Sequence, residues 1–286
     1  MTRAVLITGG KGRLGRALDT ILGRDANFRP TPLDLPDLDV TRPETLARSF
    51  AQVKPEIVFH CAAMTDVDGC EREPAKARAI NNAGTLAVAK ECREAGALLV
   101  YFSTDFVFDG TLGRPYAETD RTNPLSVYGA TKLEGERHAV MAGEHLIIRT
   151  AWLFGRKGDF VGKVLERART TGKLEMVDDQ TGSPTYAPDL AEGSVALVRA
   201  GGRGIFNVTN AGACTRYEFA KAILQSAGLA KVPVKPVKTS PAPGVAIRPA
   251  FAPLDNARFE DKTGAPLRSW NEALAEYMIS AEGPMA

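Results

Sequence analysis

The sequence holds few of the residues that build disulfide scaffolds or metal centres. Its 286 residues include four cysteines, at positions 61, 70, 92 and 214, and none of them forms a Cys-x-x-Cys pair. Small disulfide-stabilised domains are far richer in cysteine. The three histidines, at positions 60, 138 and 145, have no metal-ligand spacing. We therefore expect neither a disulfide framework nor a metal site.

The chain also lacks a long apolar run and an excess of charge of either sign. No apolar segment approaches membrane-spanning length, and the first ten residues enter a strand-like run without a basic leader region. With 36 basic and 34 acidic residues, the formal net charge is only +2. We expect a cytoplasmic protein whose main partner is neither a membrane nor a nucleic acid.

Short apolar runs alternate with longer amphipathic ones along the first 210 residues or so. Apolar segments separated by helices indicate a parallel sheet covered on both faces, that is, a doubly wound α/β domain of Rossmann type. The strand-like segments are 4–9, 28–34, 56–63, 98–104, 145–152, 174–179 and 205–209. Helical patterns between them include 13–22, 43–53, 74–95 and 126–140.

The character of the sequence changes after this region. One amphipathic helix is expected at 215–228 and another at 271–280, with a proline-rich stretch at 232–253 that favours loops and edge strands. We predict a dinucleotide-binding domain at 1–155, to which 186–209 returns. Residues 156–286 would form mainly a smaller, mixed α/β substrate lobe.

A glycine-rich turn follows the first predicted strand and opens the first predicted helix. The chemistry needs glycine for a tight turn and for close approach of a pyrophosphate to the helix N-terminus. In this context the motif predicts a dinucleotide site, the alternative being a turn with a purely structural role. The cofactor contacts predicted here are Gly9, Gly10, Lys11, Gly12, Arg13, Leu14 and Gly15.

Further cofactor contacts are expected at the ends of the next two strands. Asp39 and Val40 are placed to meet an adenine, although the same segment reads as a helix cap with Thr41 as the N-cap residue. Ala62 and Ala63 reach the carboxyl edge of the sheet, where ligands of such folds lie.

The choice between NADPH and NADH is made at the adenosine 2′ position. Asp34 ends the second predicted strand, about 20 residues beyond the glycine turn, and favours the free hydroxyl of NAD. Lys11 and Arg13 lie in the turn and favour the phosphate of NADP. We expect use of both cofactors, with a modest preference for NADP(H) over NAD(H) that depends on Arg13.

The segment LVYFSTDFVFDG (99–110) ends an apolar run in three adjacent polar residues, Ser103, Thr104 and Asp105. Tyr128 and Lys132, in a Tyr-x-x-x-Lys pattern, lie on one face of the next predicted helix. A phenol can donate a proton to a carbonyl oxygen, and Thr104 can hydrogen-bond the same oxygen. A lysine at about 6 Å would lower the pKa of the phenol by about two units. Ser103 is assigned to the cofactor.

The Tyr-x-x-x-Lys pattern occurs a second time, at Tyr217 and Lys221. This copy lies in a helix whose Phe219, Ile223 and Leu224 have core-like spacing, and no polar strand end precedes it. We interpret it as packing with a solvated lysine.

Several segments together resemble a known family. TGGKGRLG, FSTDFVF, NPLSVYGATKLEGE, IIRTAWLF and VDDQTGSPT are similar to segments of the dTDP-4-dehydrorhamnose reductases, which are extended short-chain dehydrogenases/reductases. The likeness spans nearly the whole chain. It implies reduction of the C4 ketone of dTDP-4-dehydro-6-deoxy-L-mannose to dTDP-L-rhamnose with NAD(P)H.

The resemblance also implies roles for single residues. Thr104, Tyr128 and Lys132 match the family's catalytic positions, and Lys132 would also hold the nicotinamide ribose. Tyr128 therefore belongs to the catalytic, cofactor and substrate sets at once. Thr65 matches a position near the cofactor, and Asn81 matches one with a supporting role in the site. Asp105 and Trp152 match positions that face the sugar, and Arg248 matches a partner for the nucleotide diphosphate.

The sequence departs from the family pattern at three positions. Met64 and Thr181 stand where relatives often carry histidine and tyrosine. Gly15 lies near where a magnesium-binding glutamate of dimeric relatives would come, so we expect no metal, and either a monomer or a homodimer.

Two rival functions are open at this stage. One is another nucleotide-sugar enzyme on the same scaffold, an epimerase or dehydratase. Dehydratases usually add an acidic pair beside the threonine, which Asp105-Phe106 lacks. The other is a non-catalytic NADP-binding subunit resembling the regulatory subunit of methionine adenosyltransferase, because fold alone does not settle function.

Overall fold

A six-stranded parallel sheet forms the centre of the molecule. The computed structural model describes residues 2–156 and 158–280. The strands run in the order β10 (Gly204–Asn207), β5 (His145–Thr150), β4 (Leu98–Thr104), β3 (Ile57–His60), β1 (Arg3–Thr8) and β2 (Phe28–Leu33), and every neighbouring pair is parallel. The chain changes direction across the sheet between β1 and β3. Open α/β sheets bind ligands at such a switch point.

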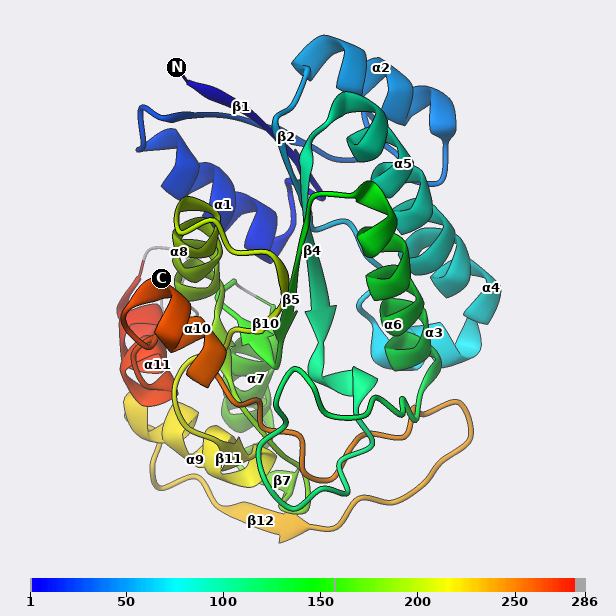
Figure 1. The fold of residues 1–286 in the computed structure, drawn as a ribbon. Coiled ribbons are helices and arrows are strands. Elements are labelled where there is room, and N and C mark those ends of the chain that lie inside the picture. The colour runs from blue at the N-terminus through cyan, green and yellow to red at the C-terminus, as the bar shows by residue number, and fades with distance from the viewer. Residues whose placement is uncertain (1, 157, 281–286) are drawn as a thin grey trace.

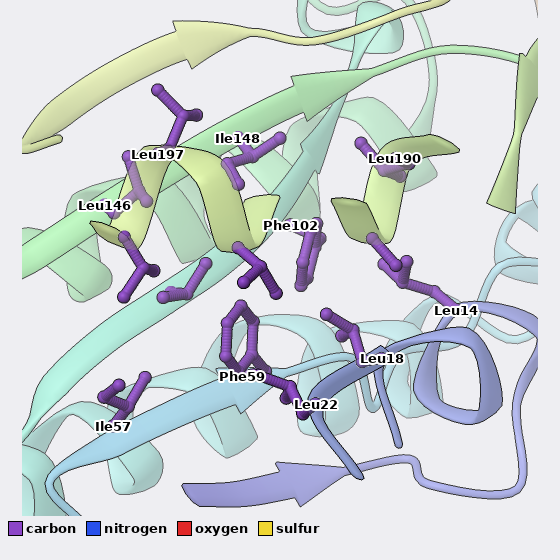
Figure 2. Close-up of a cluster of buried hydrophobic side chains, with 14 of the residues drawn as sticks. Leu14, Leu18, Leu22, Ile57, Phe59, Phe102, Leu146, Ile148, Leu190 and Leu197 are labelled. Atoms are coloured by element: carbon purple, nitrogen blue, oxygen red, sulfur yellow. The ribbon is translucent and has the colours of Figure 1, made fainter. Parts of the chain in front are cut away.

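Helices cover both faces of this sheet, which confirms the doubly wound prediction (Figure 1). One face carries α1 (Arg13–Gly23) and α8 (Ala187–Arg199), and the other carries α2 (Pro43–Val53), α5 (Thr85–Ala95) and α6 (Val127–Ala139). Figure 2 shows leucines of α1 and α8 packed over Phe59 and Phe102 of the strands. Because both faces are buried, the inner strands β1, β3 and β4 are buried and mostly apolar, whereas the edge strand β2 is partly exposed.

A second apolar cluster lies beyond the carboxyl ends of the strands. It packs α7 (Phe160–Thr171), α9 (Arg216–Ser226) and α11 (Trp270–Ile279) around Phe154. Three small sheets border it, pairing β7 (Leu174–Val177) with β12 (Val234–Val237), β8 (Thr181–Gly182) with β11 (Cys214–Thr215), and β6 (Leu153–Phe154) with β9 (Thr185–Tyr186). α8 packs on α1, and β10 extends the main sheet. The exact division into two domains stays a prediction.

Several element boundaries differ from those predicted. The single helix expected at 74–95 is α4 (Pro74–Ala77), a π-helical turn η1 (Arg78–Gly84) and α5. The strand expected at 145–152 ends at Thr150 as β5, and β6 begins only at Leu153. The strand expected at 174–179 lies outside the main sheet, paired with β12 from the proline-rich stretch. α2 begins after Arg42 rather than Thr41, whose hydroxyl donates instead to Asp39 Oδ1.

The remaining helical segments are short or were not singled out by the sequence pattern. They are α3 (Val67–Arg72), α10 (Ala257–Thr263), and the 3₁₀ turns η2 (Asp105–Val107) and η3 (Val140–Ala142). Within the part of the chain that the structure describes, no helix has the length and apolar character needed to cross a membrane.

A buried ion pair ties α6 to the sheet. Both oxygens of Glu136 accept hydrogen bonds from Arg149 of β5, at 2.8 Å from Nε and 2.7 Å from Nη2. The hydroxyl of Ser103 in β4 donates to Glu136 Oε1 at 2.5 Å. The side chains of Arg149 and Glu136 are 3% and 5% exposed. Removing one member of such a pair leaves an uncompensated buried charge.

We predict that Glu136→Ala lowers the free energy of unfolding by about 3–5 kcal/mol, because Arg149 would remain charged without its partner. Urea denaturation followed by circular dichroism measures this. Glu175→Ala is the matched control: it breaks an ion pair with Lys235 whose two side chains are 58% and 71% exposed. The control should cost less than about 1 kcal/mol. Equal losses in the two variants would show that the buried pair does not carry the stability assigned to it.

Candidate active site

A cavity of about 420 Å³ lies at the carboxyl edge of the central sheet. The glycine-rich turn after β1 and the segment after β3 line one part of it. The end of β4, the first turns of α6, the link from β5 to β6 and the start of α9 line the rest. Parallel strands bring their carboxyl ends to one edge, so residues far apart in the sequence meet here.

The glycine-rich turn has the geometry of a phosphate cradle. Gly12 N–H donates to Gly9 O at 3.0 Å, and a Cβ on Gly15 would lie 2.4 Å from that oxygen. α1 begins after Gly12 without a side-chain cap and without an acidic residue in its first turn. Its N-terminal N–H groups and dipole therefore favour an anion.

Two buried polar atoms in the cavity also fit a bound ligand. Arg13 Nε and Thr150 Oγ1 are buried and have no hydrogen-bond partner among the described residues. Both residues line the cavity. Buried polar groups are rarely left unpaired in a protein, so such atoms call for an explanation. The residues present thus fit a nicotinamide dinucleotide.

The structure brings the three predicted catalytic residues to the same cavity. Thr104, at the end of β4, donates to Asp105 Oδ1 at 2.8 Å and accepts from Phe106 N–H. Tyr128 lies in the first turn of α6, its ring edge-on to Phe106 with centroids 5.5 Å apart. Lys132 is buried one turn further on, with Nζ 4.2 Å from the centroid of the Tyr101 ring.

The prediction that Lys132 lowers the pKa of the Tyr128 phenol was wrong. Burial, with the nearby Asp105 carboxylate as a second cause, raises the pKa of the phenol above its usual value. Burial also lowers the pKa of Lys132 to about 7, against the opposing effect of Glu136. The ammonium therefore loses much of its charge near neutral pH, and its position over Tyr101 does not offset the desolvation of the phenol. Tyr128 is protonated throughout the neutral range.

The predicted substrate contacts Asp105, Trp152 and Arg248 border the other part of the cavity. Burial raises the pKa of Asp105 to about 6, while the hydrogen bond from Thr104 and the Arg216 guanidinium act in the opposite direction. Trp152 has a φ of 43°, which is unusual for a bulky residue. The guanidinium of Arg248 is bound to both oxygens of Asp68, each at 3.0 Å.

The predicted cofactor residues divide into two groups. Gly9, Gly12, Arg13, Leu14, Gly15, Ala63, Thr65 and Ser103 line the cavity with Tyr128 and Lys132, whereas Gly10, Lys11, Asp39, Val40 and Ala62 do not. The carboxylate of Asp39 accepts from the N–H and hydroxyl of Thr41. Val40 is buried against Gly84. An adenine contact at these two residues stays a prediction.

Two of the predicted residues hold parts of the cavity wall in place. The hydroxyl of Ser103 is bound to Glu136, so it is held by the ion pair that fixes α6. Asn81, in the π-helical turn, binds the N–H and the carbonyl of Met64 and donates to Thr131 Oγ1. It thereby ties the segment after β3 to α6.

The two basic side chains of the glycine-rich turn point in different directions, and which of them meets a 2′-phosphate stays a prediction. Arg13 turns toward β6, where Nη1 donates to Leu153 O at 3.2 Å. Lys11 lies beside the end of β2: its N–H donates to Asp34 Oδ2 at 2.9 Å and its Nζ donates to Leu35 O at 2.6 Å. Lys11, rather than Arg13, is the basic side chain of the turn nearest to Asp34.

The second Tyr-x-x-x-Lys pair lies elsewhere. Tyr217 and Lys221 border a different hollow, lined also by Val232 and Val234, and Lys221 is exposed. Lys221 Nζ is 5.4 Å from the Tyr217 ring. Neither residue lines the cavity that holds Thr104.

The sequence reading missed Arg216, which also lines the cavity. Arg216 directly follows the N-cap residue of α9, and no motif in its local sequence marks it as a site residue. Only the packing of α9 beside Trp152 turns the side chain inward.

Among the described residues, no group of three or more His, Cys, Asp or Glu side chains is placed to hold a metal ion, and the absence of a metal stays a prediction.

Comparison with known proteins gives the family. A family model, the RmlD substrate binding domain, matches residues 2–282. The dTDP-4-dehydrorhamnose reductase of Streptomyces griseus is 38% identical over 279 residues, covering 95% of this chain and 91% of that protein. The dTDP-4-keto-6-deoxy-D-glucose reductase of Streptomyces niveus is 36% identical, covering 96% of each.

A solved structure agrees along the whole chain. The crystal structure of dTDP-4-dehydrorhamnose reductase from Bacillus anthracis, in complex with NADP, superposes with a TM-score of 0.91 at 34% identity, covering 98% of both chains. The fold is thus that of an extended short-chain dehydrogenase/reductase. Within that class, the chain belongs to the dTDP-4-dehydrorhamnose reductase (RmlD) family.

We predict that stability depends on pH through Asp105. Folding raises the pKa of this carboxyl to about 6 from 3.8, so the folded state binds the proton more tightly. The contribution to stability is complete below about pH 4 and is lost as the pH rises through 6, by roughly 3 kcal/mol in total.

Urea denaturation of the wild type and of Asp105→Asn between pH 4 and 8 tests this. The wild type should lose stability relative to the variant as the pH rises, because the asparagine does not titrate. A difference that stays constant over this range would contradict the raised pKa.

Proposed function

We propose that the chain reduces the C4 ketone of dTDP-4-dehydro-6-deoxy-L-mannose to give dTDP-L-rhamnose, using NADPH or NADH. The observation that carries this proposal is that Thr104, Tyr128 and Lys132 line one cavity with the glycine-rich turn. A non-catalytic binding protein has no need of a proton donor at that place. Membership of the RmlD family supports the choice of substrate.

The residues of the cavity supply the proton and orient the ketone. When bound, the reduced nicotinamide supplies a hydride to the carbonyl carbon. The phenol of Tyr128 donates its proton to the carbonyl oxygen, which becomes the hydroxyl of the product. Because the pKa of Tyr128 is raised, the phenol is fully protonated at neutral pH. The alkoxide that develops in the reaction is a stronger base than a phenolate, so the transfer remains favourable.

Thr104 assists by hydrogen bonding to the same oxygen. Its proton is directed at Asp105 Oδ1 in the structure. As the ketone enters, the hydroxyl turns toward the carbonyl oxygen, where it stabilises the developing negative charge. The carboxylate of Asp105 is then available to accept a hydrogen bond from a sugar hydroxyl. Lys132 would hold the nicotinamide ribose and Gly12–Gly15 the pyrophosphate.

The name of one relative gives a second candidate. The Streptomyces niveus protein is named a dTDP-4-keto-6-deoxy-D-glucose reductase. That ketone carries the same nucleotide but the D-sugar configuration. The two functions are separated by supplying this ketone with and without the epimerase that converts it to the L-sugar, and following NADPH absorbance. NADPH oxidation that requires the epimerase supports the first candidate, and oxidation without it supports the second.

We predict that Tyr128→Phe lowers kcat by roughly 10²–10⁴-fold, as expected for loss of a general acid, with little change in cofactor affinity. The same coupled assay measures kcat, and fluorescence titration with NADPH measures binding. Tyr217→Phe is the matched control, because Tyr217 has the same motif spacing but lies outside the cavity. A larger loss of kcat in Tyr217→Phe than in Tyr128→Phe would refute the assignment.

The preference between the two cofactors should depend on Lys11. A charge-assisted hydrogen bond from Lys11 to the 2′-phosphate contributes roughly 1.5–3 kcal/mol. We expect Lys11→Ala to lower kcat/KM for NADPH by about tenfold or more while leaving that for NADH nearly unchanged. Arg13→Ala is the comparison variant and should affect both cofactors alike. If Arg13→Ala alone lowered the NADPH preference, the 2′-phosphate would lie on the other side of the turn.

A further inference from the structure

Arg216 extends from the first turn of α9 into the cavity, and its guanidinium lies over an aromatic ring. Its guanidinium carbon is 3.4 Å from the centroid of the Trp152 ring and 5.0 Å from that of Phe160. The Trp152 ring in turn rests on Gly182 of β8, where a Cβ would lie 2.5 Å from the indole. Stacking of this kind fixes the plane of a guanidinium while leaving the N–H groups at its edge free.

Among the residues that the structure describes, none forms a hydrogen bond or an ion pair with the guanidinium of Arg216, on which the Asp105 carboxylate acts only at longer range. Arg248, the other arginine of the cavity, differs in this respect. Its Nη2 is bound to Asp68 and its Nη1 to Ala246 O. The charge of Arg248 is thus largely matched by a partner, whereas the donors of Arg216 are available to a ligand.

Arg216 lies beside the residues that would face the sugar, where the phosphates of the substrate are expected. Arg216, Asp105 and Trp152 line both the main cavity and a small hollow that continues it toward Gln180 and Thr181. Asp105 directly follows Thr104, whose hydroxyl would bind the ketone. A sugar nucleotide reduced at C4 carries its phosphates on C1, across the ring from the ketone. An anion site is therefore required beyond Asp105 and Trp152.

We propose that Arg216 binds the diphosphate of the nucleotide-sugar substrate and makes the site select nucleoside diphosphates over monophosphates. This inference rests on the proposed function. The guanidinium fork matches two phosphate oxygens in a bidentate, charge-assisted contact, which the ammonium of lysine cannot reproduce.

The probe is dTDP, whose binding requires neither turnover nor a reactive sugar. Isothermal titration calorimetry compares dTDP and dTMP on the wild type, Arg216→Met and Arg216→Lys. The methionine keeps an unbranched apolar side chain over Trp152 but removes the donors. We expect Arg216→Met to bind dTDP roughly 10–100-fold more weakly, the loss expected for a charge-assisted contact, and to lose most of the preference for dTDP over dTMP. Arg216→Lys should fall between this variant and the wild type.

Two controls separate this effect from misfolding. NADPH affinity should be the same in Arg216→Met and the wild type, which reports an intact glycine-rich turn. Lys221→Met removes another cation from the same helix, outside the cavity, and should leave dTDP affinity unchanged. If Arg216→Met weakened NADPH binding and not dTDP binding, the arginine would belong to the cofactor site and the inference would be wrong.

The outcomes also distinguish this inference from the proposed function. A wild type that turns over the sugar nucleotide, with dTDP affinity unaffected by Arg216→Met, overturns the role of Arg216 alone. A wild type that binds dTDP in an Arg216-dependent manner without reducing either ketone overturns the proposed function alone. A wild type that does not bind dTDP overturns the role of Arg216.

Discussion

The arrangement of the site depends on the buried carboxylate of Glu136. It binds Ser103 of β4 and Arg149 of β5, and so fixes α6 against the two strands that lead into the cavity. Lys132 lies one turn before Glu136 on the same helix, and Tyr128 one turn before that. Thr104 directly follows Ser103. A shift of α6 along the sheet would separate the phenol from the threonine, and the short, charge-assisted bonds of Glu136 oppose such a shift.

The topology of the sheet explains why so many separate segments reach one cavity. The chain reverses its direction across the sheet between β1 and β3, which leaves a gap at their carboxyl ends that no crossover fills. The glycine-rich turn lies on one side of this gap, and Ala63 and Thr65 lie on the other. β4 contributes Thr104, and the link that follows β5 contributes Trp152, further along the same edge.

Features encoded by local pattern were predictable from the sequence, and features that depend on burial were not. The glycine-rich turn, the polar end of β4 and the Tyr128–Lys132 spacing are each contained in a short segment. The orientation of Arg13, the inward turn of Arg216 and the raised pKa of Tyr128 depend on packing between distant segments. The resemblance to a family located Trp152 and Arg248, but Arg216 had no motif to identify it. The π-helical turn within the 74–95 helix was likewise not predictable from local pattern, and its Asn81 binds the backbone of the distant Met64.

Burial favours the neutral forms of the ionisable groups around the predicted proton donor, but it leaves one arginine of the cavity charged. It shifts the pKa values of Asp105, Tyr128 and Lys132 in the direction of their neutral forms, to about 6 for Asp105 and about 7 for Lys132. The pKa of Arg216 is also lowered by burial, yet only to about 10, so this side chain keeps its positive charge at neutral pH. The phenol therefore acts in surroundings of low polarity, where a hydrogen bond to a developing oxyanion is strongest. A fixed cation next to the phenol would instead favour its ionised form. Arg216 acts on the carboxyl of Asp105 and is not among the groups that shift the pKa of Tyr128, which stays protonated.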